Sequence, residues 1–403
     1  MTTIIEILQY ILILSVGFLV AYQMLWSVLA LKGKKIENFK TTKNRKFAVV
    51  LLANNGQHIV SKSLYSLSGL VYPKNLYDLI VLAENNTDDF ANTARNLGAV
   101  VFEVKGETTK NAQNTVDLIF DKLLSLDQSY EALIIFDANS FVSGNYLEVM
   151  NYYLENGNEI IQSSSLVLPN PDKKGNKAAC VDFVLDNYVK PLGKKTMGIN
   201  FVSRNNGTCF ALDVLQQRSI NAELSYNDVF LDLMWQFKNL QVAFAPEARV
   251  FVESPLNYSL KNHQELGSKN IKEHLSKLWK GFYKNPNVRF LDNFLDTMTR
   301  SMANIITLIL IMCISNLLLW FYDVTAASFI GLWGAMGFLS LLHLFVGLRV
   351  AGSNRILHTV FSYWPSHIFA KLSGFLKSRT SLNGEQQVTQ KKVTESEDLV
   401  SGS

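Results

Sequence analysis

The sequence predicts an α/β domain with a mainly parallel sheet, joined to α-helices that cross a membrane. Between residues 47 and 150, short apolar runs of the length and composition of buried strands alternate with segments of helical character. That alternation is typical of parallel strands joined by right-handed helical crossovers. Three further apolar stretches, one near the start and two after residue 300, are long enough to span a bilayer.

The strands expected in the first half of the chain end in polar segments. They cover residues 47–53, 77–83, 100–104 and 132–136, and helices are expected over residues 89–97 and 110–124 and from residue 145. Parallel strands place their carboxyl ends at one edge of a sheet, where open α/β sheets bind ligands. We therefore expect the polar loops at residues 54–57, 84–88 and 137–140 to lie together on one rim.

Asp137 is the first candidate site residue, because it directly follows the apolar run 132–136. A carboxylate at that edge can face a crevice and hold a cation or a ribose. Alternatively, Asp137 only caps the following helix, which is a common role for Asp after a strand. The residues themselves leave both interpretations open.

The second half of the soluble part has a different pattern. A strand is expected over residues 160–168, and a turn at residues 205–207 leads into another. Two short strands, 241–245 and 249–253, are expected to pair around Pro246. Helices are expected over residues 226–237 and after residues 263–265 as far as 279, and an amphipathic helix, which can lie on a membrane surface, over 289–300.

Composition supports a protein with both globular and membrane parts. Of the 403 residues, 48% are hydrophobic and 18% are charged, which is too apolar for an ordinary soluble protein and too charged for a pure membrane bundle. The three cysteines fit no zinc pattern, so we expect reduced thiols and a cytoplasmic globular part. No Gly-rich phosphate loop is present, and no nucleic-acid partner is expected.

Residues 1–31 are expected to form an N-terminal transmembrane helix. The stretch lacks a positive n-region and a small-residue cleavage site, so it resembles an anchor more than a removed signal peptide. Seven Lys and Arg residues follow between Lys32 and Lys46, and the positive-inside rule places that end in the cytoplasm.

The C-terminal region is expected to return to the membrane. Residues 303–348 would form a hairpin of two spans, preceded by an interfacial amphipathic helix at 281–300. Residues 354–377 are expected to be a second interfacial segment, with a further span as the alternative. The polar tail, residues 378–403, is expected to be disordered.

Four segments resemble one known family in their order and content: YDLIVLAENNTDDFANTARNLGA, YEALIIFDANS, NNGTCFAL and YNDVFLDLMWQFKNLQVAFAPEARVFVESP. They are similar to motifs of the membrane-anchored family-2 inverting glycosyltransferases, and the resemblance covers roughly residues 45–380. It implies that residues 45–280 form a cytoplasmic glycosyltransferase domain with a GT-A (Rossmann-like) fold.

The resemblance also implies a donor site, although several of its motifs are altered. Glu84 stands where the family usually has Asp, and Asn139 replaces the second acid of the Asp-x-Asp motif that begins with Asp137. The implied nucleotide-sugar-binding residues are Asn55, Glu84, Asn86, Asp88, Lys110 and Asp137. Asp137 and Asn139 would hold Mg²⁺ or Mn²⁺, weakly, because Asn139 removes one negative charge from the site.

On the acceptor side, the resemblance points to Gly207, Thr208 and Gln264. Gln264 is all that survives of the expected Gln-x-x-Arg-Trp motif, and a purely structural role is favoured for it. Asp228 matches the family's catalytic base, while Asn227 replaces the Glu before it. Without the resemblance, Asp228 could equally be the N-cap of its helix.

Two functions follow. The first is transfer of a sugar, with inversion, from a nucleotide-sugar donor to a lipid or glycan acceptor at the cytoplasmic leaflet. The second is a catalytically weakened scaffold or partner subunit of a polysaccharide or glycolipid synthesis or export complex. Either predicts a multi-pass protein of the inner (cytoplasmic) membrane that contacts membrane lipids, with a polysaccharide-assembly partner or a second copy as further candidates.

Overall fold

The computed structural model of the protein describes residues 2–33, 36, 38–54, 57–84, 88–104, 123, 129–168, 177–199, 206–213, 242–252, 275–276, 278–280, 282–283, 288–299, 302–322 and 325–352. The expected helix at 226–237, the segment 354–377 and the tail 378–403 lie outside these residues. Of the helix expected at 110–124, only Leu123 is described.

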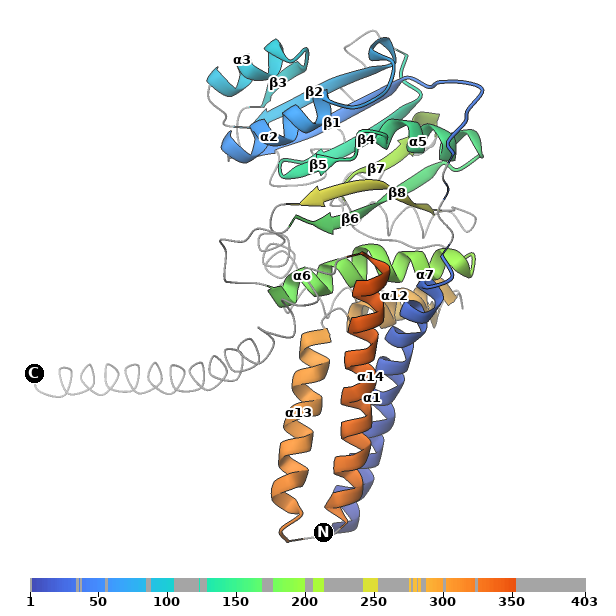
Figure 1. Cartoon of the computed structure of the whole chain (residues 1–403), viewed down its shortest axis with the longest axis vertical. Coiled ribbons are helices and arrows are strands. Elements are labelled where there is room, and N and C mark those ends of the chain that lie inside the picture. Colours follow the sequence, from blue (N-terminus) through green and yellow to red (C-terminus); the bar gives the residue numbers. More distant parts are fainter. Residues whose placement is uncertain are drawn as a thin grey trace, which may run out of the picture.

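The described strands form one mixed sheet of eight strands, in the order β3-β2-β1-β4-β7-β6-β8-β5 (Figure 1). Its first half contains β1 (Phe47–Asn54), β2 (Tyr77–Glu84), β3 (Val100–Val104) and β4 (Ala132–Asp137). All pairings among these four strands are parallel, as the sequence predicts.

The second half of the sheet contains β5 (Ser140–Val142), β6 (Ile160–Val167), β7 (Thr208–Ala211) and β8 (Val242–Val252). Here β7 runs antiparallel to both β4 and β6, and β5 runs antiparallel to β8, whereas β6 and β8 are parallel. The sheet is therefore parallel on one side and mixed on the other.

The expected pair of short strands around Pro246 is wrong. Residues 242–252 form the single strand β8, and both of its halves pair with β6. The register shifts between Ser163 and Ser164, so that Ala245 and Arg249 face consecutive residues of β6. Pro246 lacks the N–H that a regular ladder needs, which explains why the strand bulges there.

Apolar residues cover both faces of the sheet. Phe47, Val49 and Leu51 of β1 belong to one buried cluster, whereas Ala48 and Val50 belong to a second on the opposite face. Successive side chains of a strand point to opposite faces, so a strand buried on both sides becomes a continuous apolar run. The flanking helices are α2 (Gln57–Ser68), η1 (Lys74–Leu76), α3 (Asp88–Asn96) and α5 (Tyr146–Glu155).

A helical layer that the sequence analysis did not predict lies between the sheet and the apolar helices (Figure 1). It runs through α6 (Lys177–Val184), one stretch of π-helix, η3 (Leu185–Val189), and α7 (Lys190–Thr196). Its buried residues join a third apolar cluster with residues of β6, β8 and the long helices below. This layer connects the globular part to those helices.

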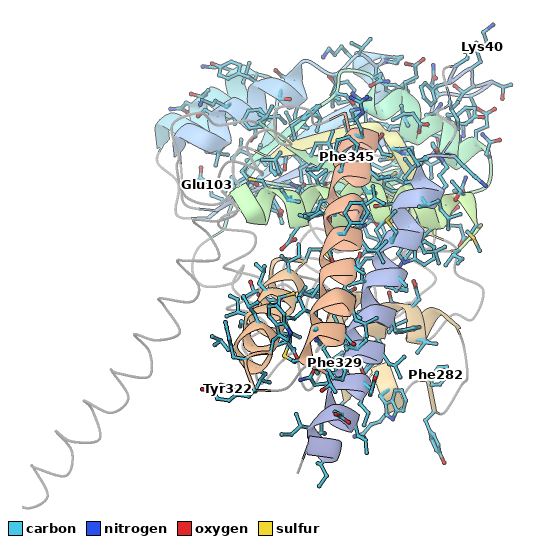
Figure 2. All side chains as sticks on the ribbon, turned by 60° about the horizontal axis from the view of Figure 1, so that its bottom comes forward. Lys40, Glu103, Phe282, Tyr322, Phe329 and Phe345 are labelled. Carbon is cyan, nitrogen blue, oxygen red and sulfur yellow. The ribbon has the colours of Figure 1, made fainter. Side chains whose placement is uncertain are left out.

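The long apolar helices are α1 (Thr2–Ala30) and α14 (Ala326–Val350), with the shorter α13 (Met302–Leu319) beside them (Figure 1). In the described part of the chain, two helical segments are long and apolar enough to cross a membrane, Ile4–Ala30 and Ala326–Val350. The amphipathic helix α12 (Val288–Met298) precedes α13. Tyr322 follows α13 at the end of the bundle, whereas Lys40 and Glu103 belong to the globular part (Figure 2).

Candidate functional site

The carboxyl ends of three neighbouring strands meet at one edge of the sheet. In the parallel register, Leu52 of β1 is opposite Asp137 of β4, and Asn54 is opposite Glu84 of β2. The backbone thus places the ends of these strands on one rim, as expected from the sequence. This is the edge at which open α/β sheets bind their ligands.

Asp137 ends β4 and begins a tight turn, residues 137–140, which we call the Asp137 turn. The chain continues directly into β5, and the next helix, α5, starts later with Asn145 as its N-cap. The interpretation of Asp137 as the cap of the following helix is therefore wrong. The side chains of Asp137 and Asn139 are both half-buried, so part of each remains accessible at the rim.

Asn206 holds the two ends of the Asp137 turn together. Its Oδ1 accepts a hydrogen bond from the backbone N–H of Asp137 at 3.0 Å, and its Nδ2 donates to Oγ of Ser140. That hydroxyl in turn donates to the carbonyl oxygen of Asp137 at 2.7 Å. Asn206 is only 8% exposed, so these bonds are made in a largely dry setting.

Side chains from two other elements also fix the turn and the strand after it. From α2, Ser63 Oγ donates to the carbonyl of Ala138 at 2.7 Å, and Ser66 Oγ accepts from the backbone N–H of Val142 at 2.9 Å. From β6, Ser163 Oγ donates to the carbonyl of Asn206 at 3.2 Å. A turn bonded from several rigid elements is preorganised, which a ligand site requires.

Gly207 is required by the packing beside this turn. Its φ of +79° lies in the left-handed region, and an added Cβ would lie 2.7 Å from the Tyr146 hydroxyl and 2.9 Å from Cε1 of Phe136. The Tyr146 hydroxyl also donates to the Gly207 carbonyl. Thr208 is fully buried in β7, opposite Ile135. Both residues support the strand that carries Asp137, and their acceptor-side role stays a prediction.

The remaining predicted site residues are placed only in part. Glu84 is the last residue of β2 and Asp88 the first of α3, and for these two the structure describes the backbone alone. Five others lie outside the described residues: Asn55, Asn86, Lys110, Asp228 and Gln264. The structure therefore brings together Asp137, Asn139 and the end of β2, and it leaves the assignment of the base as a prediction.

The oxygen donors of the Asp137 turn suit a hard cation but are few. Among the described residues, no three His, Cys, Asp or Glu side chains form a metal-binding group. Mg²⁺ uses few carboxylates and keeps other oxygens, such as water and phosphate, in its coordination shell. Asp137 and Asn139 therefore fit a cation that a bound diphosphate helps to hold.

Cys209 is a potential nucleophile close to the site. It lies in β7, opposite Ile134 of β4. It is fully buried, and burial raises the pKa of its thiol well above the ordinary value. A protonated, inaccessible thiol is not a nucleophile. Cys180 and Cys313 are also free thiols.

Sequence analysis missed Asn206. The residue lies directly before Gly207 in the segment NNGTCFAL, in which only Gly207 and Thr208 are predicted site residues. Its role depends on a bond to Asp137, 69 positions earlier in the chain, and no local pattern reports such a contact. The Asn-Gly pair, which is typical of turns, was the one available signal.

Comparison with known proteins identifies the fold. No model of a known protein family matches the sequence, and no curated protein matches it. Among solved structures, the mannosyltransferase PcManGT from Pyrobaculum calidifontis, in complex with GDP-Man and Mn²⁺, is similar with a TM-score of 0.51 and 9% identity. The alignment covers 85% of this chain and 98% of that one.

Two other solved structures are similar at lower scores. Glucosyl-3-phosphoglycerate synthase from Mycobacterium tuberculosis, with Mn²⁺, UDP and phosphoglyceric acid, has a TM-score of 0.38 and 16% identity over 59% of this chain and 78% of that one. TarS from S. aureus has a TM-score of 0.41 and 11% identity over 62% and 43%. The chain has a GT-A-like glycosyltransferase fold, as the sequence resemblance predicts.

Proposed function

We propose that the protein is a membrane-bound glycosyltransferase that moves a sugar from a nucleotide-sugar donor to a lipid or glycan acceptor at the cytoplasmic leaflet, with inversion. The observation that carries sugar transfer is the GT-A-like fold, with Asp137 at the carboxyl end of β4 on the rim where such sheets bind ligands. The similar mannosyltransferase binds GDP-Man and Mn²⁺, which supports a donor of this chemical class.

In the proposed donor site, Asp137 and Asn139 would hold Mg²⁺ or Mn²⁺ through a carboxylate and an amide oxygen. When bound, the cation stabilises the negative charge that develops on the nucleoside diphosphate as the glycosidic bond breaks. The network around Asn206 keeps the Asp137 turn in one geometry while this happens. Asn55, Glu84, Asn86, Asp88 and Lys110 complete the proposed donor site.

Asp228 is the proposed general base. Inversion requires a carboxylate on the face of the sugar opposite the leaving group, where it removes the proton of the attacking acceptor hydroxyl. The family resemblance supports Asp228 in that role. Gly207, Thr208 and Gln264 belong to the proposed acceptor side.

The proposed location is the inner (cytoplasmic) membrane, crossed by α1, α13 and α14. The length and apolar composition of Ile4–Ala30 and Ala326–Val350 support it, and so do the basic residues that follow α1. A cysteine introduced at Asp323 should then be labelled from outside intact cells, and one at Asn170 should not. The reverse labelling pattern would contradict this topology.

A second candidate function is a scaffold or partner subunit of a glycan-synthesis complex. Asn139 favours it, because an amide stands where the related enzymes have the second carboxylate of their metal motif. In this case the fold would bind a donor, a partner protein or a second copy without catalysis.

One assay separates the two candidates. Purified protein with membrane lipid extract is offered several nucleotide sugars, and release of nucleoside diphosphate is measured. For an enzyme, Asp228→Asn should lower transfer by roughly 10²–10⁴-fold with donor binding nearly unchanged, which is the usual contribution of a general base. Asp137→Ala should instead weaken donor and metal binding. If neither substitution alters a measured transfer, or no donor is turned over, the scaffold function is favoured.

A further inference from the structure

A group of buried charges lies where α1, α7 and α12 meet. We call it the Lys194 cluster, and it consists of Tyr22, Lys190, Lys194, Asp292 and Asp296. Lys194 is 0% exposed, and its Nζ pairs with Asp292 at 2.6 Å and also with Asp296. Lys190 lies 3.4 Å from Asp296. The Tyr22 hydroxyl oxygen lies 2.8 Å from Asp292 Oδ1 and 2.7 Å from Asp296 Oδ1, and its single proton is shared between these two acceptors.

The cluster fixes which side of α12 faces the protein. Asp292 is 7% exposed, and one turn later Asp296 also faces inward, followed by Thr299, whose carbonyl accepts a 3.0 Å hydrogen bond from Gln23 of α1. Met298, on another side of the helix, is 52% exposed. α12 thus buries its carboxylates and exposes its apolar side, which is the reverse of a helix on a water-soluble domain.

The apolar side of α12 has helical spacing. We call it the apolar stripe, and it consists of Leu291, Phe294, Leu295 and Met298, at positions i, i+3, i+4 and i+7. Leu291 and Met298 are 38% and 52% exposed, whereas Phe294 and Leu295 are half-buried. Phe294 also packs against Trp279, with 5.6 Å between the ring centroids. Trp279 and Tyr283 are themselves exposed. Trp and Tyr beside an apolar surface are typical of a membrane–water interface.

The lengths of α1 and α13 indicate how deep α12 would lie in a membrane. A helix rises about 1.5 Å per residue, so Tyr22 lies about 27 Å along α1 from Ile4. α13 begins at Met302, three residues after Thr299, and its 18 residues also extend about 27 Å. The hydrocarbon core of a bilayer is about 30 Å thick, so both helices reach the level of α12 near one edge of that core.

We propose that the apolar stripe of α12 inserts into lipid at the boundary between the hydrocarbon core and the headgroups, and that the Lys194 cluster holds the helix in this orientation. The occupant is lipid hydrocarbon because α12 contacts α1 and leads within a few residues into α13, and both of those helices expose apolar side chains such as Leu14 and Ile314. Pairing Lys194 with two aspartates inside the protein removes charges that would be costly in lipid.

The proposal rests on the proposed membrane location and is independent of sugar transfer. It is tested by spin-labelling single cysteines in full-length protein reconstituted in phosphatidylcholine–phosphatidylglycerol vesicles. Cys180 and Cys313 are first replaced by alanine, and buried Cys209 is shown not to take the label. Collision with oxygen, which concentrates in lipid, is then compared with collision with a water-soluble nickel complex.

Met298→Cys and Leu291→Cys report on the stripe. Leu14→Cys, on the exposed side of α1, is the lipid control, and Tyr65→Cys, on the exposed side of α2, is the water control. The expected result is that both stripe positions favour oxygen over nickel, as Leu14→Cys does. Preference for nickel at the stripe, as at Tyr65→Cys, would overturn the proposal, and so would protection from both reagents, since a protein partner would then cover the stripe.

The Leu14→Cys control distinguishes an error in the membrane location from an error in the placement of α12. If Leu14→Cys itself favours nickel, the membrane location is wrong and the placement of α12 fails with it. If Leu14→Cys favours oxygen and the stripe does not, only the placement of α12 is wrong.

The orienting role of the cluster needs its own comparison. Adding Lys194→Gln to the Met298→Cys protein should make the label more mobile and more accessible to nickel, because Asp292 loses its lysine partner and Asp296 keeps Lys190 alone. Lys195→Gln, one position along and outside the cluster, should leave both readings unchanged. Identical spectra for the two variants would show that Lys194 does not orient the helix.

Discussion

Replacing Asn206 by alanine should loosen the Asp137 turn without touching the carboxylate itself. The substitution removes the acceptor for the Asp137 backbone N–H and the donor to Ser140 Oγ. Ser140 keeps its bond to the Asp137 carbonyl, and Ser63 keeps its bond to Ala138. The turn should therefore persist, but with its first residue held less firmly.

The size of the effect follows from these bonds. Loss of the bond to Ser140 Oγ costs about 1 kcal/mol, and leaving the Asp137 N–H without its acceptor costs about 1 kcal/mol more, at the low end of the range because Asp137 is half-buried. A total of about 2 kcal/mol should lower the melting temperature by roughly 4–8 °C for a domain of this size. Donor and metal affinity should also fall several-fold, since Asp137 is no longer preorganised.

The measurements are thermal unfolding in detergent and calorimetric titration with nucleoside diphosphate and Mg²⁺. Asn92→Ala is the matched control, because Asn92 is exposed on α3 and makes one surface contact with Arg95. Exposed substitutions of this kind usually change stability by less than about 0.5 kcal/mol. If Asn206→Ala and Asn92→Ala behaved alike in both measurements, the argument that Asn206 positions the turn would be refuted.

Three further predictions concern helix packing, acid stability and the metal. Gly193→Ala should cost about 1–3 kcal/mol in thermal unfolding, because the new Cβ would meet the Trp26 backbone where α7 crosses α1, whereas Gly331→Ala, which meets nothing, should be near neutral. Burial disfavours the charge of Asp296, but the neighbouring lysines outweigh it and hold its pKa below the ordinary value of about 4. Its stabilising effect is thus fully present above about pH 4 and lost as the pH falls further, so the melting temperatures of wild type and Asp296→Asn should differ by a constant amount down to about pH 4 and converge below it; a difference that persists at lower pH would contradict this. Asn139→Asp should tighten Mg²⁺ binding in calorimetry with nucleoside diphosphate present, and no gain would mean that this side chain faces away from the cation.

The parallel half of the sheet could be predicted because a strand that is buried on both faces is a continuous apolar run in the sequence. The run FAVVLLA becomes β1, and YDLIVLA becomes β2, each within one residue of the expected end. The helix at α3 was likewise predictable, since Gly98 adopts a φ of +83° just after it, as a helix-ending glycine does. These features are set by residues close together in the chain.

The features that the sequence did not predict depend on partners far away in the chain. The halves of β8 look like a hairpin around Pro246, and only pairing with β6 makes them one bulged strand. α12 was predicted as amphipathic, but its orientation depends on Lys194, 98 positions before Asp292. The network at Asn206 is of the same kind. Charge and amphipathic pattern alone do not say which side of a helix the protein will cover.

A single apolar cluster joins the sheet to the long helices, and this limits how the proposed enzyme could reach its acceptor. The cluster includes Val252 of β8, Val189 of η3 and Trp333 of α14, all buried. Interiors packed in this way transmit displacements rather than absorb them, so the sheet and α14 should move together. The rim at Asp137 would then stay at a fixed height above the plane of the Lys194 cluster. Figure 1 shows the helical layer between the sheet and the long helices, so in the proposed enzyme an acceptor hydroxyl would have to extend to the rim. This favours a lipid with an extended polar head, or a glycan, over a hydroxyl held at the lipid surface.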